Sequence, residues 1–130
     1  MIILFGNPTT KKNSQKIIVN QRTGRPMVVQ GEKYRWYEQT CLWRLLTQKD
    51  AIAAEMDGKK PPYNCKYIFY RDSERIVDET NLQSAMDDIL VAAGVLPDDN
   101  FKIIGGHDGS RVRIDRENPR VEITITELED

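Results

Sequence analysis

Six carboxylates lie between residues 75 and 100 of a chain of 130 residues whose net charge is only −1. They are Asp78, Glu79, Asp87, Asp88, Asp98 and Asp99. Carboxylates that converge in space repel one another unless a cation lies between them, and Mg²⁺ binds one or two such groups together with water and phosphate. The segment therefore predicts a site where a metal ion is held against a phosphate, as in phosphodiesterases. The alternative is that each carboxylate serves separately in a helix cap, a turn or a solvated surface.

One amphipathic helix is predicted to position these carboxylates. Its apolar stripe, with spacings of three and four residues, consists of Leu82, Ala85, Met86, Ile89, Leu90 and Ala93. Thr80 followed by Gln83 fits a capping box, so the helix is expected to begin near Thr80 and to end at Gly94. A polar strip away from the apolar stripe, which could face one cleft, consists of Asn81, Ser84 and Asp88.

The charges are divided unevenly along the chain. Residues 1–50 contain nine Lys and Arg against three Asp and Glu, a balance of +6, whereas residues 51–130 contain ten against seventeen, a balance of −7. A basic surface beside an acidic cluster is what a metal-dependent enzyme acting on nucleic acid needs, because basic residues bind the phosphates while carboxylates hold the metal. Charge complementarity between two parts of one fold is the alternative.

A basic hairpin is predicted near the N-terminus. The opening MIILFG predicts a strand, and a polar, basic loop follows it. Residues 16–30 then predict a β-hairpin that turns at Gly24 and Pro26 and carries Arg22 and Arg25 at its tip. The tip either contacts DNA or is a solvated feature without a partner.

A long helix is predicted from Glu32 to about Glu55, because this stretch contains no Pro or Gly. Its apolar residues at helical spacing are Tyr34, Tyr37, Cys41 and Leu45. The aromatic residues are expected to pack against the sheet, and stacking of a nucleic-acid base on Trp36 or Tyr37 is the alternative.

Further strands are predicted on both sides of the acidic segment. NCKYIFYR, residues 64–71, and RVEITITEL, residues 120–128, alternate in a way typical of strands. FKIIGG, residues 101–106, predicts a short strand, and residues 107–119 predict a loop. The length of the chain fits one domain spanning residues 1–130.

The remaining residues with reactive side chains have simpler interpretations. Cys41 and Cys65 lie alone in apolar surroundings and are expected to be buried free thiols. His107 is the only histidine; a loop position is preferred for it, since Asp108 and Gly109 form a turn signal, although a general base or metal ligand is conceivable. No stretch has the pattern of a signal peptide or a membrane span, so a cytoplasmic protein without membrane contact is expected.

One spacing pattern is more specific than any single residue. The pattern D-x-x-N-L-x-x-x-x-x-D-x-L-x-x-A-G-x-x-x-D-D is formed by Asp78, Asn81, Leu82, Asp88, Leu90, Ala93, Gly94, Asp98 and Asp99. It resembles the RusA family of Holliday-junction resolvases, and the basic loop with KKNS, the long helix and the closing strand agree more weakly with that family.

The resemblance implies an α+β fold with a small mixed β-sheet and two main helices, and a homodimer that binds four-way DNA junctions. It also implies paired nicks made with Mg²⁺, for which Mn²⁺ is a substitute, in DNA recombination and repair; such enzymes are generally encoded by phages and prophages. Asp78 matches the family's first essential aspartate and Asp99 the last, while Asp88 and Asp98 match acidic positions whose role is less defined. Asp78 and Asp99, with Glu79, are the expected metal ligands.

Two positions depart from the family pattern. The aspartate that directly precedes the Asn in the family is Thr80 here, and the lysine three residues after the Asn is Ser84. Glu79 is a candidate to replace the missing carboxylate, and Lys102 or Arg75 to replace the missing cation. The departures bear on the rate, the metal arrangement and the junction selectivity more than on the fold.

Three hypotheses of function follow. In the first, the protein is an endonuclease in which the metal and a carboxylate activate water, and the DNA backbone is held by Lys11, Lys12, Lys16, Arg22 and Arg25, with Arg75 and Lys102 near the phosphate that is cut. In the second, it binds branched DNA and cuts it weakly or not at all, as Thr80 and Ser84 indicate. In the third, it has a purely structural or protein-binding role, which the division of charge disfavours.

Overall fold

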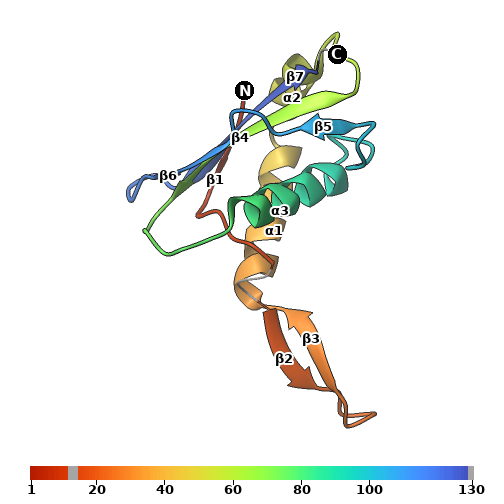
Figure 1. The fold of residues 1–130 in the computed structure, drawn as a ribbon, viewed down its shortest axis with the longest axis vertical. Coiled ribbons are helices and arrows are strands. Elements are labelled where there is room, and N and C mark those ends of the chain that lie inside the picture. Colours follow the sequence, from red (N-terminus) through yellow and green to blue (C-terminus); the bar gives the residue numbers. More distant parts are fainter. Residues whose placement is uncertain (12–14, 129–130) are drawn as a thin grey trace.

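A computed structural model describes residues 1–11 and 15–128, but not the side chains of residues 15, 16 and 28–30. In chain order the elements are β1 (Ile2–Phe5), β2 (Gln15–Val19), β3 (Pro26–Gln30), α1 (Glu32–Leu46), α2 (Lys49–Met56), β4 (Tyr63–Arg71), α3 (Glu79–Ala92), β5 (Ile104–Gly106), β6 (Arg111–Ile114) and β7 (Arg120–Glu127) (Figure 1). The mixture of helices with two sheets confirms the predicted α+β class.

The main sheet has the order β1-β7-β4-β5, with β6 also paired to β4. β7 runs antiparallel to both β1 and β4, whereas β5 and β6 run parallel to β4. The sheet is therefore mixed, as expected. Ile123 of β7 lies opposite Ile2 on one side and Tyr67 on the other, so the central strand joins residues from distant parts of the chain.

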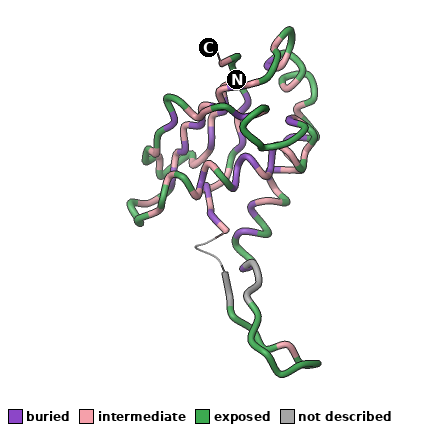
Figure 2. Tube along the Cα trace, turned by 45° about the vertical axis from the view of Figure 1, so that its right-hand side comes forward, coloured by how far each residue is buried: buried purple, intermediate pink, exposed green. Residues whose placement is uncertain are grey.

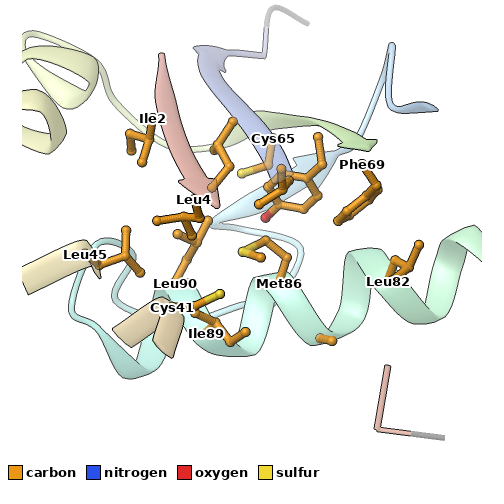
Figure 3. Close-up of a cluster of buried hydrophobic side chains, with 14 of the residues drawn as sticks. Ile2, Leu4, Cys41, Leu45, Cys65, Phe69, Leu82, Met86, Ile89 and Leu90 are labelled. Atoms are coloured by element: carbon orange, nitrogen blue, oxygen red, sulfur yellow. The ribbon is translucent and has the colours of Figure 1, made fainter. Parts of the chain in front are cut away.

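The core lies between one face of this sheet and the helices α1 and α3 (Figure 3). The predicted alternation is confirmed, because Cys65, Tyr67 and Phe69 are buried while the residues between them are partly exposed. On β7 the buried residues are Val121, Ile123 and Ile125. From the helices, Cys41, Leu45, Leu82, Met86, Ile89 and Leu90 meet the sheet, and both cysteines are buried free thiols as predicted.

The predicted helix from Glu32 to about Glu55 is wrong in its length. The buried stripe of α1 is as expected, but the helix ends at Leu46 and a separate helix α2 follows. Gln48 leaves the helical conformation at φ −117° and ψ 34°, and its side-chain amide donates to the carbonyl oxygen of Ile3 at 3.1 Å. A contact with a distant strand therefore overrides local helix propensity.

The predicted start of α3 near Thr80 is confirmed to within one residue, but the capping box predicted for Thr80 and Gln83 is wrong. Asp78, not Thr80, is the N-cap residue, and no side chain caps the helix. The carbonyl oxygen of Asp78 accepts the backbone N–H groups of Asn81 and Leu82 at 3.1 and 3.3 Å, so the N-cap lies two residues before Thr80. The predicted end is confirmed, because Gly94 adopts φ +78° directly after the C-cap Ala93.

Residues 107–119 were expected to form only a loop, and this prediction is wrong because they contain β6. Arg111 pairs with Ile68 and Ile114 with Arg71 in a parallel register. β6 is an edge strand with exposed arginines, so its own sequence lacks the apolar alternation that marks β4 and β7.

The predicted hairpin is confirmed as β2 and β3, which form a separate sheet of two strands. It projects from the rest of the molecule beyond the start of α1 (Figure 1), and its described residues are mostly exposed (Figure 2). Gly24 makes the turn with φ +69°, while Pro26 begins β3 and is not part of the turn.

Candidate metal and nucleic-acid site

Asp88 and Asp99 are brought together at the C-terminal part of α3. Asp88 lies in the third turn of the helix, and Asp99 lies in the loop that leads from the helix to β5. The carboxyl group of Asp88 lies close enough to that of Asp99 to affect its ionisation. Partial desolvation, followed by the contacts with Asp88 and Asp98, raises the pKa of Asp99 above its usual 3.8. Besides desolvation, the neighbouring carboxylates of Asp88 and Asp98 thus disfavour the charged form of Asp99.

Asp98 has a different environment from its neighbour. Its carboxylate accepts the backbone N–H of Asp99 at 2.7 Å and the side-chain amide of Asn100 at 3.1 Å. These hydrogen bonds lower the pKa of Asp98. Asp98 therefore shapes the loop that presents Asp99, and Lys102 lies exposed in the next turn, with its N–H donating to Asn100 at 2.9 Å.

Lys11 is the basic residue next to this carboxyl pair. Its Nζ donates to Oδ2 of Asp88 at 2.7 Å and lies 5.7 Å from the centre of the Tyr34 ring. Both ends of the ion pair are more than a third exposed, so it contributes little to stability. The ion pair instead fixes the position of an ammonium group beside the carboxyl pair.

Asp78 and Glu79 lie at the opposite end of α3. Ten residues separate Asp78 from Asp88, which corresponds to about 15 Å along a helix. Asp78 contacts the Asn81 amide at 3.4 Å and is exposed. Oε1 of Glu79 is buried and has no hydrogen-bond partner among the described residues. The structure therefore separates the predicted metal ligands into two acidic places.

The carboxyl pair of Asp88 and Asp99 supplies the number of carboxylates that a magnesium ion needs. Mg²⁺ is held by one or two carboxylates and keeps several waters. Asp88 and Asp99 meet that requirement, although within residues 1–11 and 15–128 no cluster of three or more acidic, His or Cys side chains is assembled. Thr80 and Ser84 are exposed and add neither a carboxylate nor a cation.

The other predicted DNA-binding residues whose side chains are described lie in two regions. Arg22 and Arg25 are exposed at the hairpin tip, and Arg75 is exposed in the loop before α3. Lys12 and the side chain of Lys16 lie outside the described residues. The hairpin tip thus lies far from the carboxyl pair, on an element that projects from the sheet (Figure 1).

A polar cluster that the sequence did not predict connects β4, α3 and the loop after β5. Asp87 is buried, accepts the hydroxyl of Tyr67 at 2.6 Å, and has both carboxylate oxygens 2.9 Å from Nε2 of His107. Burial and the charge of Asp87 raise the pKa of Tyr67. The loop position preferred for His107 is compatible with this placement, but its partner is new. A buried tyrosine needs a partner for its hydroxyl, which is the one signal that the sequence offered.

The helices of the described chain are too short and too polar to cross a bilayer. In comparisons with known proteins, no family model matches the sequence, and no curated protein matches it.

Proposed function

We propose that the protein is a Mg²⁺-dependent endodeoxyribonuclease that binds four-way DNA junctions and nicks their strands. The proposal is supported above all by the carboxyl pair of Asp88 and Asp99, which converges from two segments and has Lys11 beside it. It also agrees with the spacing pattern that resembles the RusA family. Mn²⁺ is expected to substitute for Mg²⁺.

Each residue of the pair has a defined part in this proposal. When bound by Asp88 and Asp99, the cation supplies positive charge for the phosphate and activates a water molecule. Asp88 would hold the cation from the helix and Asp99 from the loop that follows it. Lys11 is placed to contact the same phosphate through its ammonium group.

The basic hairpin extends the proposed DNA surface. Arg22 and Arg25 lie exposed at the tip, where backbone phosphates are the natural partners. Such contacts give affinity without sequence information, so binding should weaken steeply as salt rises.

A homodimer is part of the proposal, since a four-way junction offers two equivalent strands and each copy can cut one of them. The hairpin is the proposed place of contact. Ile17 and Val19 are 76% and 63% exposed, and Ile18 and Met27 oppose each other on the other face of the hairpin. A hairpin of two strands is marginal alone in water, so packing on a second copy would stabilise it.

A DNA-binding protein of the same fold with weak or no cleavage is the second candidate. It is favoured by Lys11, whose ammonium group already neutralises Asp88, and by the absence of charge at Thr80 and Ser84. In that case Lys11 replaces the cation, and the acidic pair has a structural role.

The deciding experiment is cleavage of a labelled four-way junction and of a linear duplex with the same sequence, in Mg²⁺ or in EDTA. Wild type should make paired nicks in the junction only when Mg²⁺ is present. Asp88→Asn and Asp99→Asn should each slow nicking by about a hundredfold or more, because a carboxylate lost from the pair weakens the hold on the cation. Asp50→Asn, an exposed acidic residue of α2, is the matched control.

The same assay separates the candidates. Junction binding without nicking by wild type supports the second candidate and removes the enzyme assignment. Loss of nicking in Asp78→Asn, with full activity in Asp88→Asn, would place the metal at the N-terminal end of α3 and overturn the assignment of the carboxyl pair.

A further inference from the structure

An open cleft of about 910 Å³ lies at the end of the molecule where α1 begins. Its walls come from the connection after β1, the first turns of α1 and the loop that follows β4. Its charged lining consists of Lys33, Arg71 and Arg75 against Glu32 and Asp72, and Trp36 adds an aromatic ring. A cavity of this size is within the range that holds a ligand with the dimensions of a nucleotide.

The part of the cleft that follows β4 contains an arginine held in place by backbone carbonyl groups. Arg71 is only 9% exposed; its Nη1 donates to the carbonyl oxygen of Arg75 at 2.6 Å and its Nε to that of Pro8 at 3.4 Å. Asp72 is fixed in turn, because its backbone N–H donates to the side chain of Asn7 at 2.9 Å. Burial lowers the pKa of Arg71, Asp72 opposes the shift, and the neighbouring charge of Arg75 adds to it. Arg71 and the exposed Arg75 both line this part of the cleft, and guanidinium groups favour an anion beside them.

The part of the cleft formed by α1 carries an exposed aromatic ring. Trp36 is 69% exposed, although it belongs to a helix whose buried stripe runs through Tyr34, Tyr37 and Cys41. It is thus on the face of α1 that the core does not use. Lys33, one turn earlier on the same helix, adds a flexible cation to the same cleft.

A flat aromatic surface and cationic groups in one cleft match a base together with its phosphates. We propose that this cleft binds an unstacked nucleotide of a branched DNA strand, with the base on Trp36 and the adjoining phosphates at Lys33 and Arg75. Bases within a duplex cannot reach such a ring unless they leave the stack, whereas bases at a branch point are already easier to unstack. The inference rests on the proposed function and adds to it a subsite that selects branched over linear DNA.

The two tryptophans of the chain allow a matched test. Trp43 is 70% exposed on the same helix and does not line the cleft. The Trp43→Phe variant therefore reports the fluorescence of Trp36 alone, and Trp36→Phe reports Trp43 alone. Each variant is titrated with a four-way junction, a linear duplex, a single-stranded thymidine oligomer and free thymidine monophosphate.

The junction and the oligomer are expected to quench the fluorescence of Trp36 strongly, and the duplex to quench it weakly. Trp43 should respond little to any of them. Trp36→Ala should weaken junction binding roughly tenfold, as loss of one base–aromatic stack does, while Trp43→Ala should change it less than twofold. Because both side chains are exposed, both variants should melt close to wild type.

The outcomes distinguish this inference from the proposed function. If wild type binds no DNA in a gel-shift assay at low salt, the proposed function fails and this inference fails with it. If wild type binds the junction but Trp36 is not quenched, or both tryptophans are quenched equally, only the cleft assignment is overturned. Tighter binding of the free monophosphate than of the oligomer would also overturn it, because the site would then be one for a small molecule.

Discussion

At the scale of single residues, the buried cluster of Tyr67, Asp87 and His107 holds together three elements that are distant in sequence. Asp87 is a buried carboxylate, and such a group is stable only when its oxygens are hydrogen-bonded. Because a carboxylate only accepts hydrogen bonds, the N–H at Nε2 of His107 must donate to it. His107 therefore positions the loop after β5, and the general-base alternative is not needed to explain its presence.

Replacing His107 tests this interpretation. His107→Ala should lower the free energy of unfolding by about 1–2 kcal/mol, because Asp87 keeps the Tyr67 hydroxyl but loses its second donor. Urea unfolding measures the change, and Asp108→Ala, at an exposed neighbouring position, is the control that should stay within about 0.5 kcal/mol of wild type. Unchanged stability with lost nicking would instead assign His107 to the chemistry.

For single residues, the sequence predicted which side chains belong to the candidate site but not which of them meet. Asp88 and Asp99 were identified as candidates because a local spacing pattern contains both of them. Their meeting depends on the path of the loop after α3, which no local pattern determines. Asp87 was missed because its partner His107 lies twenty residues further along the chain, and a single histidine beside a turn signal does not reveal what it contacts.

At the scale of elements, periodic segments were predictable and their interruptions were not. β4, β7 and the stripes of α1 and α3 have local periods of two or about 3.6 residues that follow from burial on one face. The end of α1 at Leu46 depends on Gln48 reaching Ile3, and β6 forms only because β4 offers it an edge. For α3, Asp78 and Thr80 both resemble N-cap residues, and local sequence alone did not decide between them.

The break between α1 and α2 allows α2 to place Glu55 against the sheet. The carboxylate of Glu55 is buried, accepts the backbone N–H of Ile125 at 2.7 Å and pairs with the amino group of Met1. Burial alone would raise the pKa of Glu55, but these hydrogen bonds and the nearby cations outweigh it, and the pKa lies below 4.5.

A pH dependence follows from this lowered pKa. Glu55 contributes stability that is present above about pH 4.5, its pKa in the unfolded chain, and is lost as the pH falls through the lower folded value. Glu55→Gln should therefore reduce stability by about 1 kcal/mol at pH 7 and differ progressively less from wild type in acid. Thermal melts from pH 7 to pH 3 measure the difference in stability between Glu55→Gln and wild type, with Asp50→Asn as the control. A difference in melting temperature that stays constant with pH would contradict the prediction.

At the scale of the whole molecule, the division of charge along the sequence becomes a division in space. The basic tip of the hairpin projects away from the sheet, while the acidic residues of α3 remain on the main body (Figure 1). The proposed DNA ligand would therefore contact the hairpin tip and the main body at the same time. In this arrangement the apolar residues of the hairpin stay exposed, and no described part of the chain covers them.

The proposed dimer makes a prediction at this scale. Wild type should sediment as a dimer at micromolar concentration, and Ile17→Lys should shift it to a monomer, because a charge would be desolvated in an apolar contact. Gln21→Lys adds the same charge near the exposed tip and should leave the dimer intact. A wild-type monomer at tens of micromolar would rule out the hairpin as the contact.

The position of β7 affects how the chain folds while it is being synthesised. β7 is the last of the described elements in the chain, yet it lies between β1 and β4 and pairs residues 120–123 with residues 2–5. A nascent chain cannot complete the sheet until residue 127 has left the ribosome, so the edges of β1 and β4 that pair with β7 stay unpaired until then. Closing so distant a pairing also slows folding. The newly made chain should therefore depend on chaperones more than a helical protein of equal length does.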